Sequence, residues 1–305
     1  MSTSPIDLSK SAFTRLVQRK SLACLEIRHP AFRADILLQG AQLLQFAPTG
    51  QDSWVWLSNS ADYVEGVSVR GGIPVCWPWF GNADRNPASV QDHLQMANNP
   101  PAHGFARTQV WNISDLYESA DRVEVEMTLQ PGQQFANVWN GSAVVKARWV
   151  MTARSLRMSL TTLNTGTTPL TFSQALHTYF PTTSIQQTRL RGLHGREYLE
   201  TLEGWVRKTQ TGDVSFTGET DRIYFPATNQ NLQLMTPQQT LQLGCDQSAS
   251  CIVWNPWIAK ARRLGQFQPD AWQTMFCVET ANAADDVVTL AAGAHHSMTL
   301  TLSRS

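Results

Sequence analysis

The sequence predicts an all-β protein, and more narrowly a large, mainly antiparallel β-sandwich. Residues 122–129, 155–161 and 297–302 alternate between polar and apolar side chains, the period of a strand with one buried face. Turn signals such as Asn140-Gly141 and Asn164-Thr165-Gly166 separate runs of this kind at spacings typical of hairpins. No segment of several turns carries an apolar stripe with a 3.6-residue period. Strands that follow one another as antiparallel neighbours are therefore expected.

One domain is expected to span residues 1–305, because all-β folds often exceed 200 residues as a single unit. We find no internal repeat, low-complexity run or linker rich in glycine and serine that would divide the chain. The stretch 82–101, rich in Pro and Asn, is predicted to be a long loop over one end of the sheet. Loops of that length often carry function.

Charge and cysteine content limit the partners that we expect. Lys plus Arg and Asp plus Glu number 24 each, so the protein has no overall field to attract nucleic acid or an anionic membrane. Residues 1–32 lack the apolar core of a signal peptide, and no later apolar run approaches the length of a membrane span. The five cysteines form no CxxC pair, which favours a reducing compartment without structural zinc. A soluble, cytoplasmic monomer is expected.

The chain contains eleven tryptophans, which is unusual beside only 16% charged residues. Several stand in pairs: Trp54/Trp56, Trp77/Trp79 and Trp254/Trp257. Two interpretations are open. The rings fill the core, because each aromatic ring buries a large apolar area. Alternatively, some form a platform on which the C–H face of a sugar ring packs.

Three titratable residues stand in unusual surroundings. Glu279 lies within the apolar segment 276–282, where a buried charge is costly unless it has a partner or a function. His103 and His177 lie in similar segments, and burial would lower the pKa of a histidine and raise that of a carboxylate. If His177 and Glu279 face each other across a pocket, they can exchange protons with a substrate. The pattern suggests acid–base chemistry on a small polar substrate.

Residues 69–81 form a shaped loop. Gly71 and Gly72 follow Arg70 and let the backbone approach a ligand closely or adopt positive φ. A P-loop is excluded because the Gly-Lys-Ser/Thr ending is missing. Arg70 and Arg107 could each grip an anion with the planar guanidinium, or form a surface ion pair.

Taken together, these segments resemble the aldose 1-epimerase (mutarotase) superfamily, and most closely its glucose-6-phosphate 1-epimerase branch. The resemblance covers about residues 40–302 and rests on six segments in the expected order: RGGIPVCWP (70–78), HGFAR (103–107), ALHTYF (175–180), DRIY (221–224), VWNPW (253–257) and CVET (277–280). It implies a galactose-mutarotase-like supersandwich, with His177 as general acid and Glu279 as general base.

The same resemblance implies that His103 and Asp221 contact the sugar and that Arg70 and Arg107 face the substrate and its phosphate. The implied substrate is a phosphorylated hexose, and the implied reaction exchanges its α and β anomers without a metal or other cofactor. Lys260 receives no role. Gln266 stands where the family pattern leads us to expect an acidic residue.

Three alternatives remain open at this point. A mutarotase of free hexoses would give Arg70 and Arg107 little to do. A carbohydrate-binding protein without activity would bind sugar without turnover. A glycoside hydrolase would need two carboxylates flanking the scissile bond, and only Glu279 and Asp221 are candidates.

Overall fold

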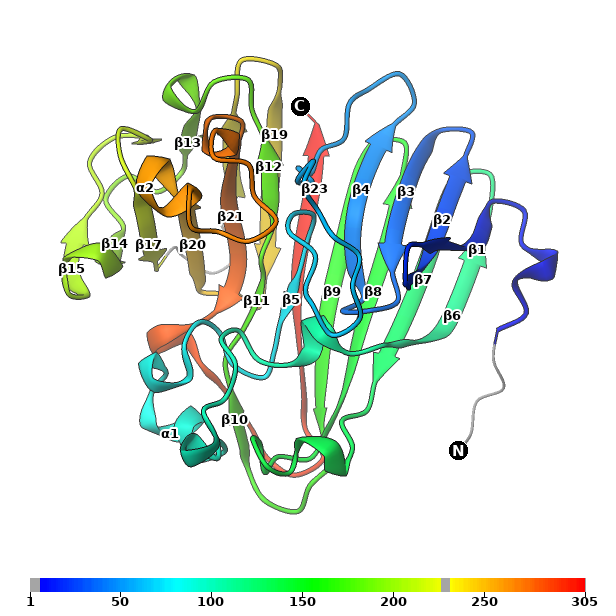
Figure 1. Ribbon diagram of the computed structural model, residues 1–305, viewed down its shortest axis with the longest axis horizontal. Helices are drawn as coiled ribbons and strands as arrows, with labels where there is room; N and C mark the ends of the chain where they lie inside the picture. Colours follow the sequence, from blue (N-terminus) through cyan, green and yellow to red (C-terminus); the bar gives the residue numbers. More distant parts are fainter. Residues whose placement is uncertain (1–5, 226–230, 305) are drawn as a thin grey trace.

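The computed structural model describes residues 6–225 and 231–304, and strands dominate that part of the chain (Figure 1). The α-helices found there are short, α1 (Ala88–Gln91) and α2 (Trp257–Ala261). No helix in these described ranges is long and apolar enough to cross a membrane. All pairs between the named strands are antiparallel, as expected from the turn signals.

The largest sheet has nine strands within the described residues. In spatial order they are β16 (Val214–Ser215), β13 (Arg189–Arg191), β18 (Asn231–Met235), β19 (Thr240–Asp246), β23 (His295–Arg304), β9 (Ser155–Asn164), β8 (Ala143–Thr152), β7 (Arg122–Leu129) and β6 (Asn112–Glu118).

A second sheet of eight described strands positions the site. Its order is β15 (Val206–Thr209), β14 (Glu197–Glu200), β17 (Thr220–Tyr224), β20 (Ser250–Asn255), β21 (Met275–Asn282), β11 (Gln174–Leu176) and β5 (Val75–Cys76), and β12 (Tyr179–Pro181) also pairs with β21. Two smaller sheets accompany these: β1 (Thr14–Arg19), β2 (Leu22–His29), β3 (Phe32–Leu37) and β4 (Gln42–Pro48) in one, and β10 (Leu170–Phe172) with β22 (Val288–Leu290) in the other.

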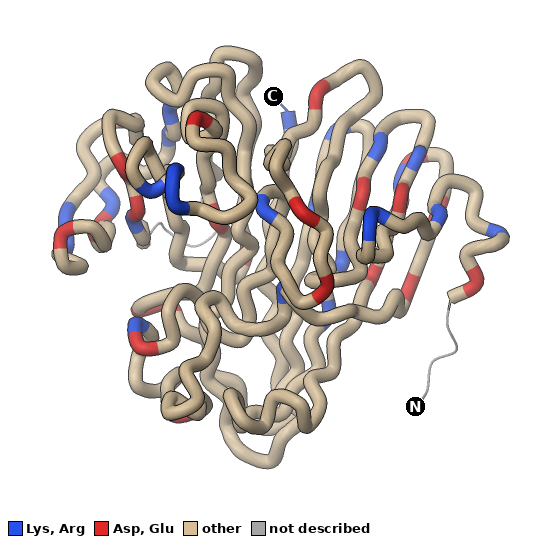
Figure 2. Tube along the Cα trace, viewed as in Figure 1, with Lys and Arg blue, Asp and Glu red and all other residues tan. Residues whose placement is uncertain are grey.

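Alternation along β7, β8 and β9 places one face of the large sheet in the core. The inward positions are buried and apolar, including Val125, Trp149 and Met158, whereas the intervening residues are less buried and mostly polar. Each buried aliphatic side chain contributes about 1.5–3 kcal/mol. On the outer face Arg148 pairs with Glu124. Figure 2 shows both signs of charge mixed over the half of the molecule where β1–β4 overlie β6–β9. In a β-sandwich each sheet buries one face in the core and exposes the opposite, more polar face to solvent, as this sheet does.

The layers meet in one continuous cluster of buried apolar side chains. Phe46 of β4, Trp149 of β8 and Val278 of β21 all belong to it, so β1–β4 and the eight-stranded sheet share a core with the large sheet. In Figure 1 strands β1–β4 lie over β6–β9. The predicted antiparallel β-sandwich is confirmed, and the expectation of one domain spanning 1–305 stays a prediction.

The tryptophan pairs divide between the two interpretations. Trp54, Trp77 and Trp79 are completely buried and fill the core. Trp254 lies on the face of β20 that lines a cavity. The core interpretation therefore applies to three of the six paired rings, and Trp254 of the last pair lines the cavity wall.

The segment 82–101 is a long loop, as predicted, but it contains short helical turns. These are η2 (Ala83–Arg85), α1 and η3 (Met96–Asn98). Asn86 anchors the loop, because its Nδ2 donates to the carbonyl of Phe80 at 2.9 Å and its Oδ1 accepts from Ser173 Oγ at 2.5 Å. This loop lies below β20 and β21 in Figure 1 and contributes residues to the wall of the same cavity as Trp254.

Candidate active site

One cavity of about 430 Å³ brings together all the residues predicted to act in catalysis or substrate binding. They come from segments far apart in the sequence, and each lines the wall: Arg70, His103, Arg107, His177, Asp221 and Glu279. The volume suits one monosaccharide phosphate. Strands carry some of these side chains and loops carry the others.

The floor of the cavity is one face of the eight-stranded sheet. Glu279 of β21 is opposite Ile252 of β20, and Ile252 is in turn opposite Ile223 of β17. Side chains two residues apart share a face of a strand. Asp221 therefore lies on the same face as Glu279, in the neighbouring row that also contains Trp254.

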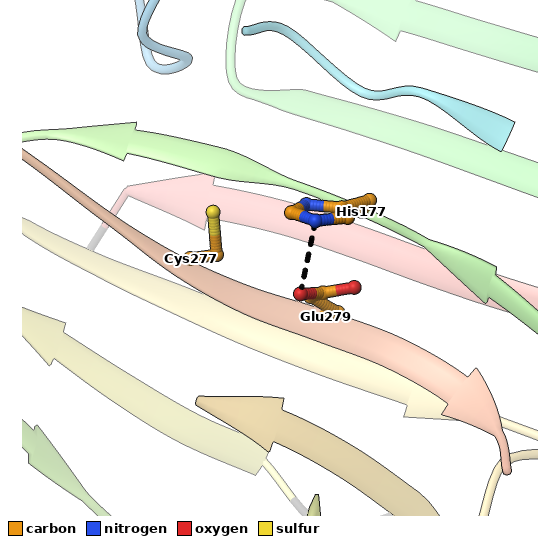
Figure 3. A group of neighbouring side chains, drawn as sticks. All are labelled: His177, Cys277 and Glu279. Carbon is orange, nitrogen blue, oxygen red and sulfur yellow. Dashed lines mark ion pairs between the residues drawn. The ribbon is translucent and has the colours of Figure 1, made fainter. Parts of the chain in front are cut away.

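His177 lies in the short gap between β11 and β12, opposite β21. Its backbone N–H donates to the carbonyl of Pro74 at 3.0 Å. Its Nε2 lies 3.5 Å from Oε1 of Glu279, the contact drawn in Figure 3. The structure thus brings together the two residues for which acid–base roles are predicted, and these roles stay predictions.

Burial controls the protonation of this pair. It lowers the pKa of His177 well below its ordinary value, and the nearby charges of Arg70 and Arg107 act in the same direction. It raises the pKa of Glu279 well above its ordinary value, helped by the charge of Asp221. The pair therefore holds one proton between its two groups over a wide range of pH, and its titration belongs to the pair rather than to either residue.

Two atoms of the pair have no hydrogen-bond partner among the described residues. They are Nδ1 of His177 and Oε2 of Glu279, both buried. Buried polar atoms are nearly always paired, and an exception needs an explanation. Polar groups of a ligand in the cavity would give Oε2 of Glu279 the partner that the protein does not supply.

Two glycines position Arg70. Gly72 has φ of +64°, and a Cβ there would lie 2.0 Å from the carbonyl oxygen of Leu43. Gly71 has φ of +115°, and a Cβ there would lie 2.7 Å from the carbonyl oxygen of Trp56 and from the Cα of Leu57. The backbone can therefore pack closely against β4 at Gly72, and against Trp56 and Leu57 at Gly71, only with glycine at these positions. Two hydrogen bonds hold the Arg70 side chain: Nη1 donates to the Tyr179 hydroxyl at 3.2 Å, and Nε donates to the Gly265 carbonyl at 3.4 Å.

His103 occupies an unusual backbone conformation next to Gly104. Its φ is +64°, which is rare for a residue with a side chain and common at functional sites. The Gly81 N–H donates to its Nδ1 at 3.3 Å, so in the neutral ring Nε2 carries the proton. Burial, with the charges of Arg107 and Arg70, lowers the pKa of His103 to about 3. His103 is therefore a neutral hydrogen-bond donor.

The cations of the cavity fall into two groups. Arg70 and Arg107 have no carboxylate within ion-pair distance among the described residues, and the Arg107 Nη2 donates only to the Ala102 carbonyl at 2.7 Å. The Lys260 Nζ, in contrast, lies 3.5 Å from Asp221 Oδ2 and 3.4 Å from Glu219 Oε1. The two arginines are thus uncompensated, whereas the charge of Lys260 is already paired.

Asp221, the predicted sugar contact, therefore already forms an ion pair with Lys260. Burial raises the pKa of Asp221, and the charge of Lys260 opposes that shift. The Lys260 ammonium also lies 5.8 Å from the ring centre of Trp254. A hydroxyl group bound by Asp221 would lie next to both side chains.

The described residues contain one group of side chains able to hold a metal ion, namely His177, Cys277 and Glu279, with ligand atoms within 4.8 Å of one another. Figure 3 shows all three facing the same space. The donors fit a metal poorly. Burial and the charge of Glu279 raise the pKa of the Cys277 thiol well above its ordinary value, whereas metal binding requires the thiolate.

Sequence reasoning missed several residues of the cavity wall: Arg85, Thr201 and Trp205. Arg85 lies 6.0 Å from the ring centre of Trp205. Nothing in their local sequence distinguishes these three from surface loop residues, so no signal was present. Gln266, which replaces the acidic residue expected from the family pattern, binds the loop that precedes Arg70: its Oε1 accepts from the Asp62 N–H and its Nε2 donates to the Ser68 carbonyl.

A mainly antiparallel sandwich with a histidine and a glutamate facing a sugar-sized cavity defines a class of sugar epimerases. The chain belongs to the aldose 1-epimerase family, whose profile matches residues 23–303. The family predicted from the six sequence segments is therefore confirmed.

The chain is similar to named relatives. A protein of Escherichia coli (strain K12) named "Putative glucose-6-phosphate 1-epimerase" is 30% identical over 266 residues, 87% of this chain and 84% of the relative. One of the same name from Salmonella typhimurium is 29% identical, over 88% of this chain and 87% of the relative.

Solved structures give the same fold. The crystal structure titled "putative mutarotase (YeaD)" from Salmonella typhimurium has a TM-score of 0.85 at 26% identity. The match covers 99% of this chain and 97% of that chain. Galactose 1-epimerase from Lactobacillus acidophilus has a TM-score of 0.67 at 14% identity, with 96% of this chain and 98% of that chain covered. The second likeness shows the fold alone.

Proposed function

We propose that this protein interconverts the α and β anomers of a hexose 6-phosphate, glucose 6-phosphate first, by opening and reclosing the sugar ring. The observation that carries the proposal is the presence, in one cavity, of the His177–Glu279 pair and of two uncompensated arginines, Arg70 and Arg107. The names of the Escherichia coli and Salmonella relatives support the same substrate.

Ring opening requires one proton to leave and one to arrive. With the pair in its charged form, the Glu279 carboxylate takes the proton of the C1 hydroxyl while the His177 imidazolium gives a proton to the ring oxygen. The bond between C1 and the ring oxygen breaks, which yields the aldehyde and the C5 hydroxyl. General acid–base catalysis of this kind contributes about 10²–10⁴-fold.

The pair is then neutral, with the proton on Glu279. That is the form favoured by burial, so the cavity stabilises the pair that accompanies the open-chain sugar. Rotation about C1–C2 presents the other face of the aldehyde. On reclosure His177 takes the C5 hydroxyl proton and Glu279 returns its proton to the C1 oxygen, which restores the starting pair.

The remaining residues would position the substrate. Arg70 and Arg107 would bind the phosphate, because guanidinium groups match phosphate oxygens and these two lack carboxylate partners. Phosphate binding would offset two of the charges that lower the pKa of His177, and so favour the imidazolium form. His103 would donate from Nε2 to a sugar oxygen, and Asp221 would accept from a hydroxyl.

We place this reaction in the cytoplasm and assign it to a monomer. The buried thiols of Cys24, Cys76, Cys251 and Cys277 carry no disulfide, which suits a reducing compartment. Size-exclusion chromatography with light scattering tests the monomer, which is expected at a mass of 34.0 kDa.

The experiment that tests the function is anomer exchange, measured by NMR for glucose 6-phosphate and for glucose. We expect the protein to accelerate both exchanges and to favour the phosphate ester. Equal acceleration of the two sugars would support a mutarotase of free hexoses. Binding of sugar without acceleration would support the non-catalytic alternative, and release of a reducing sugar from a glycoside would support a hydrolase.

A further inference from the structure

Tyr179 contacts both Arg70, the proposed phosphate-binding residue, and His177, the proposed acid, although it does not line the cavity. Its side chain is buried, with 2% of the residue exposed, on β12 beside Cys277 of β21. The backbone is clamped on both sides: its N–H donates to the Gly72 carbonyl at 3.0 Å, and its carbonyl accepts from the Trp56 N–H at 2.9 Å. Tyr179 is therefore a fixed point next to the Arg70 loop.

The hydroxyl group of Tyr179 holds Arg70. It accepts a hydrogen bond from Nη1 of the guanidinium at 3.2 Å, and the Gly265 carbonyl accepts from Nε at 3.4 Å. An arginine free to rotate loses conformational entropy when it binds a ligand. Two anchor points remove much of that loss before phosphate arrives, because the guanidinium is already oriented.

The ring of Tyr179 holds His177. The two rings are stacked, with centroids 4.8 Å apart and planes inclined by 9°. Behind the tyrosine, the Trp56 ring stacks at 5.8 Å and that of Trp254 meets its edge at 6.2 Å. The imidazole plane is thus set by a rigid aromatic stack, and this plane directs Nε2 toward Glu279.

We propose that Tyr179 is a positioning residue which fixes the phosphate-binding arginine through its hydroxyl group and the acid–base histidine through its ring. It sets the distance and direction from the phosphate subsite to the anomeric centre. This inference rests on the proposed function and deepens it, because it names the element that couples recognition of the phosphate ester to proton transfer.

The two contacts can be removed separately. Tyr179→Phe deletes the hydroxyl and keeps the ring, whereas Tyr179→Leu deletes both contacts. Tyr224→Phe is the matched control: this buried tyrosine also accepts from an arginine, with Arg222 Nη1 at 3.4 Å, and donates to Gln210 Oε1 at 2.7 Å, but it does not line the cavity.

Steady-state anomer exchange and calorimetric binding of glucose 6-phosphate are measured for each folded variant. We expect Tyr179→Phe to raise KM and the Kd for glucose 6-phosphate about tenfold, the effect of a lost hydrogen bond to a charged group, with kcat within about twofold of wild type. For free glucose its kcat/KM stays near wild type. Tyr179→Leu lowers kcat for both sugars by about ten- to a hundredfold. Tyr224→Phe changes none of these constants.

The outcomes separate the two proposals. An active wild type with the same KM and Kd in Tyr179→Phe overturns the role of the tyrosine and leaves the proposed function standing. A Tyr179→Phe variant that loses affinity for glucose and for its phosphate equally also overturns it, because a structural defect would do the same. If wild type fails to accelerate exchange, the proposed function is wrong. The role of the Tyr179 hydroxyl is then tested by the Kd for glucose 6-phosphate alone, and a Kd that does not change in Tyr179→Phe overturns that role.

Discussion

The Nε2 atom of His177 and the Oε1 atom of Glu279 face each other at 3.5 Å across the floor of a sugar-sized cavity. This separation exceeds the 2.7–3.2 Å of a strong hydrogen bond, so neither atom is committed to the other. A substrate group can therefore compete for both. Together with the unpaired Oε2 of Glu279, the geometry provides a proton donor and a proton acceptor side by side.

The pH dependence of kcat should be a broad bell. Burial lowers the pKa of His177 and raises that of Glu279, so a second proton binds the pair only in acid and its single proton leaves only in base. Both limbs therefore lie further from neutrality than two exposed side chains would place them. Because free substrate has its own phosphate ionisation, kcat rather than kcat/KM is the quantity to record across pH. A profile with only one limb would contradict a two-residue mechanism.

Arg70→Ala and Arg107→Ala should each lower kcat/KM for glucose 6-phosphate by about 10–100-fold, the range for hydrogen bonds to a charged group, and change that for glucose little. Lys260→Ala is the control, since its charge is already paired with Asp221 and Glu219. In this variant the ratio of the two specificity constants should be retained. The phosphate assignment fails if the arginine variants lose activity on both sugars in the same proportion.

Glu279→Gln should become more stable relative to wild type as pH rises. The folded protein raises the pKa of Glu279, so its contribution to stability is fully present below the ordinary value of 4.5 and is lost as pH rises toward the folded value. Glutamine does not titrate. Urea unfolding at several pH values measures the difference in free energy of unfolding between the two proteins. A difference that stays constant with pH would show that burial does not act on this carboxyl group.

Gly72→Ala should lower the free energy of unfolding by about 2–4 kcal/mol, because it combines positive φ with a Cβ placed 2.0 Å from the Leu43 carbonyl oxygen. Gly212→Ala has a similar φ of +70° but no atom within 4 Å, so only the backbone cost of about 1 kcal/mol is expected there. Thermal and urea unfolding compare the two. Equal losses would mean that close packing against β4 does not constrain the Arg70 loop.

Local sequence predicts the fold well because strand period and turn residues are local properties. The alternation at residues 122–129 identified β7 with its bounds, and the absence of long helices from the described residues agrees with the same pattern. The unusual settings of His103, His177 and Glu279 pointed to the cavity, since a titratable group in an apolar segment is conspicuous without any structure.

Contacts between distant segments could not be predicted. The Arg70–Tyr179 hydrogen bond and the pairing of Lys260 with Asp221 depend on the register of strands and on loop shape. Arg85 and Trp205 lie in ordinary loop sequence and become part of the wall only because two loops converge. These contacts between distant segments decide whether a cationic side chain is free to bind phosphate or is neutralised by a carboxylate.

The central claim is that His177 and Glu279 act as one unit in ring opening. The most direct test is the rate of anomer exchange of glucose 6-phosphate for His177→Asn, Glu279→Gln and the double variant. We predict that each single substitution lowers kcat by about 10²–10⁴-fold and that the double variant is little slower than either single one, because groups that act together are not additive. Single variants that keep wild-type rates, or losses that multiply in the double variant, would contradict the account.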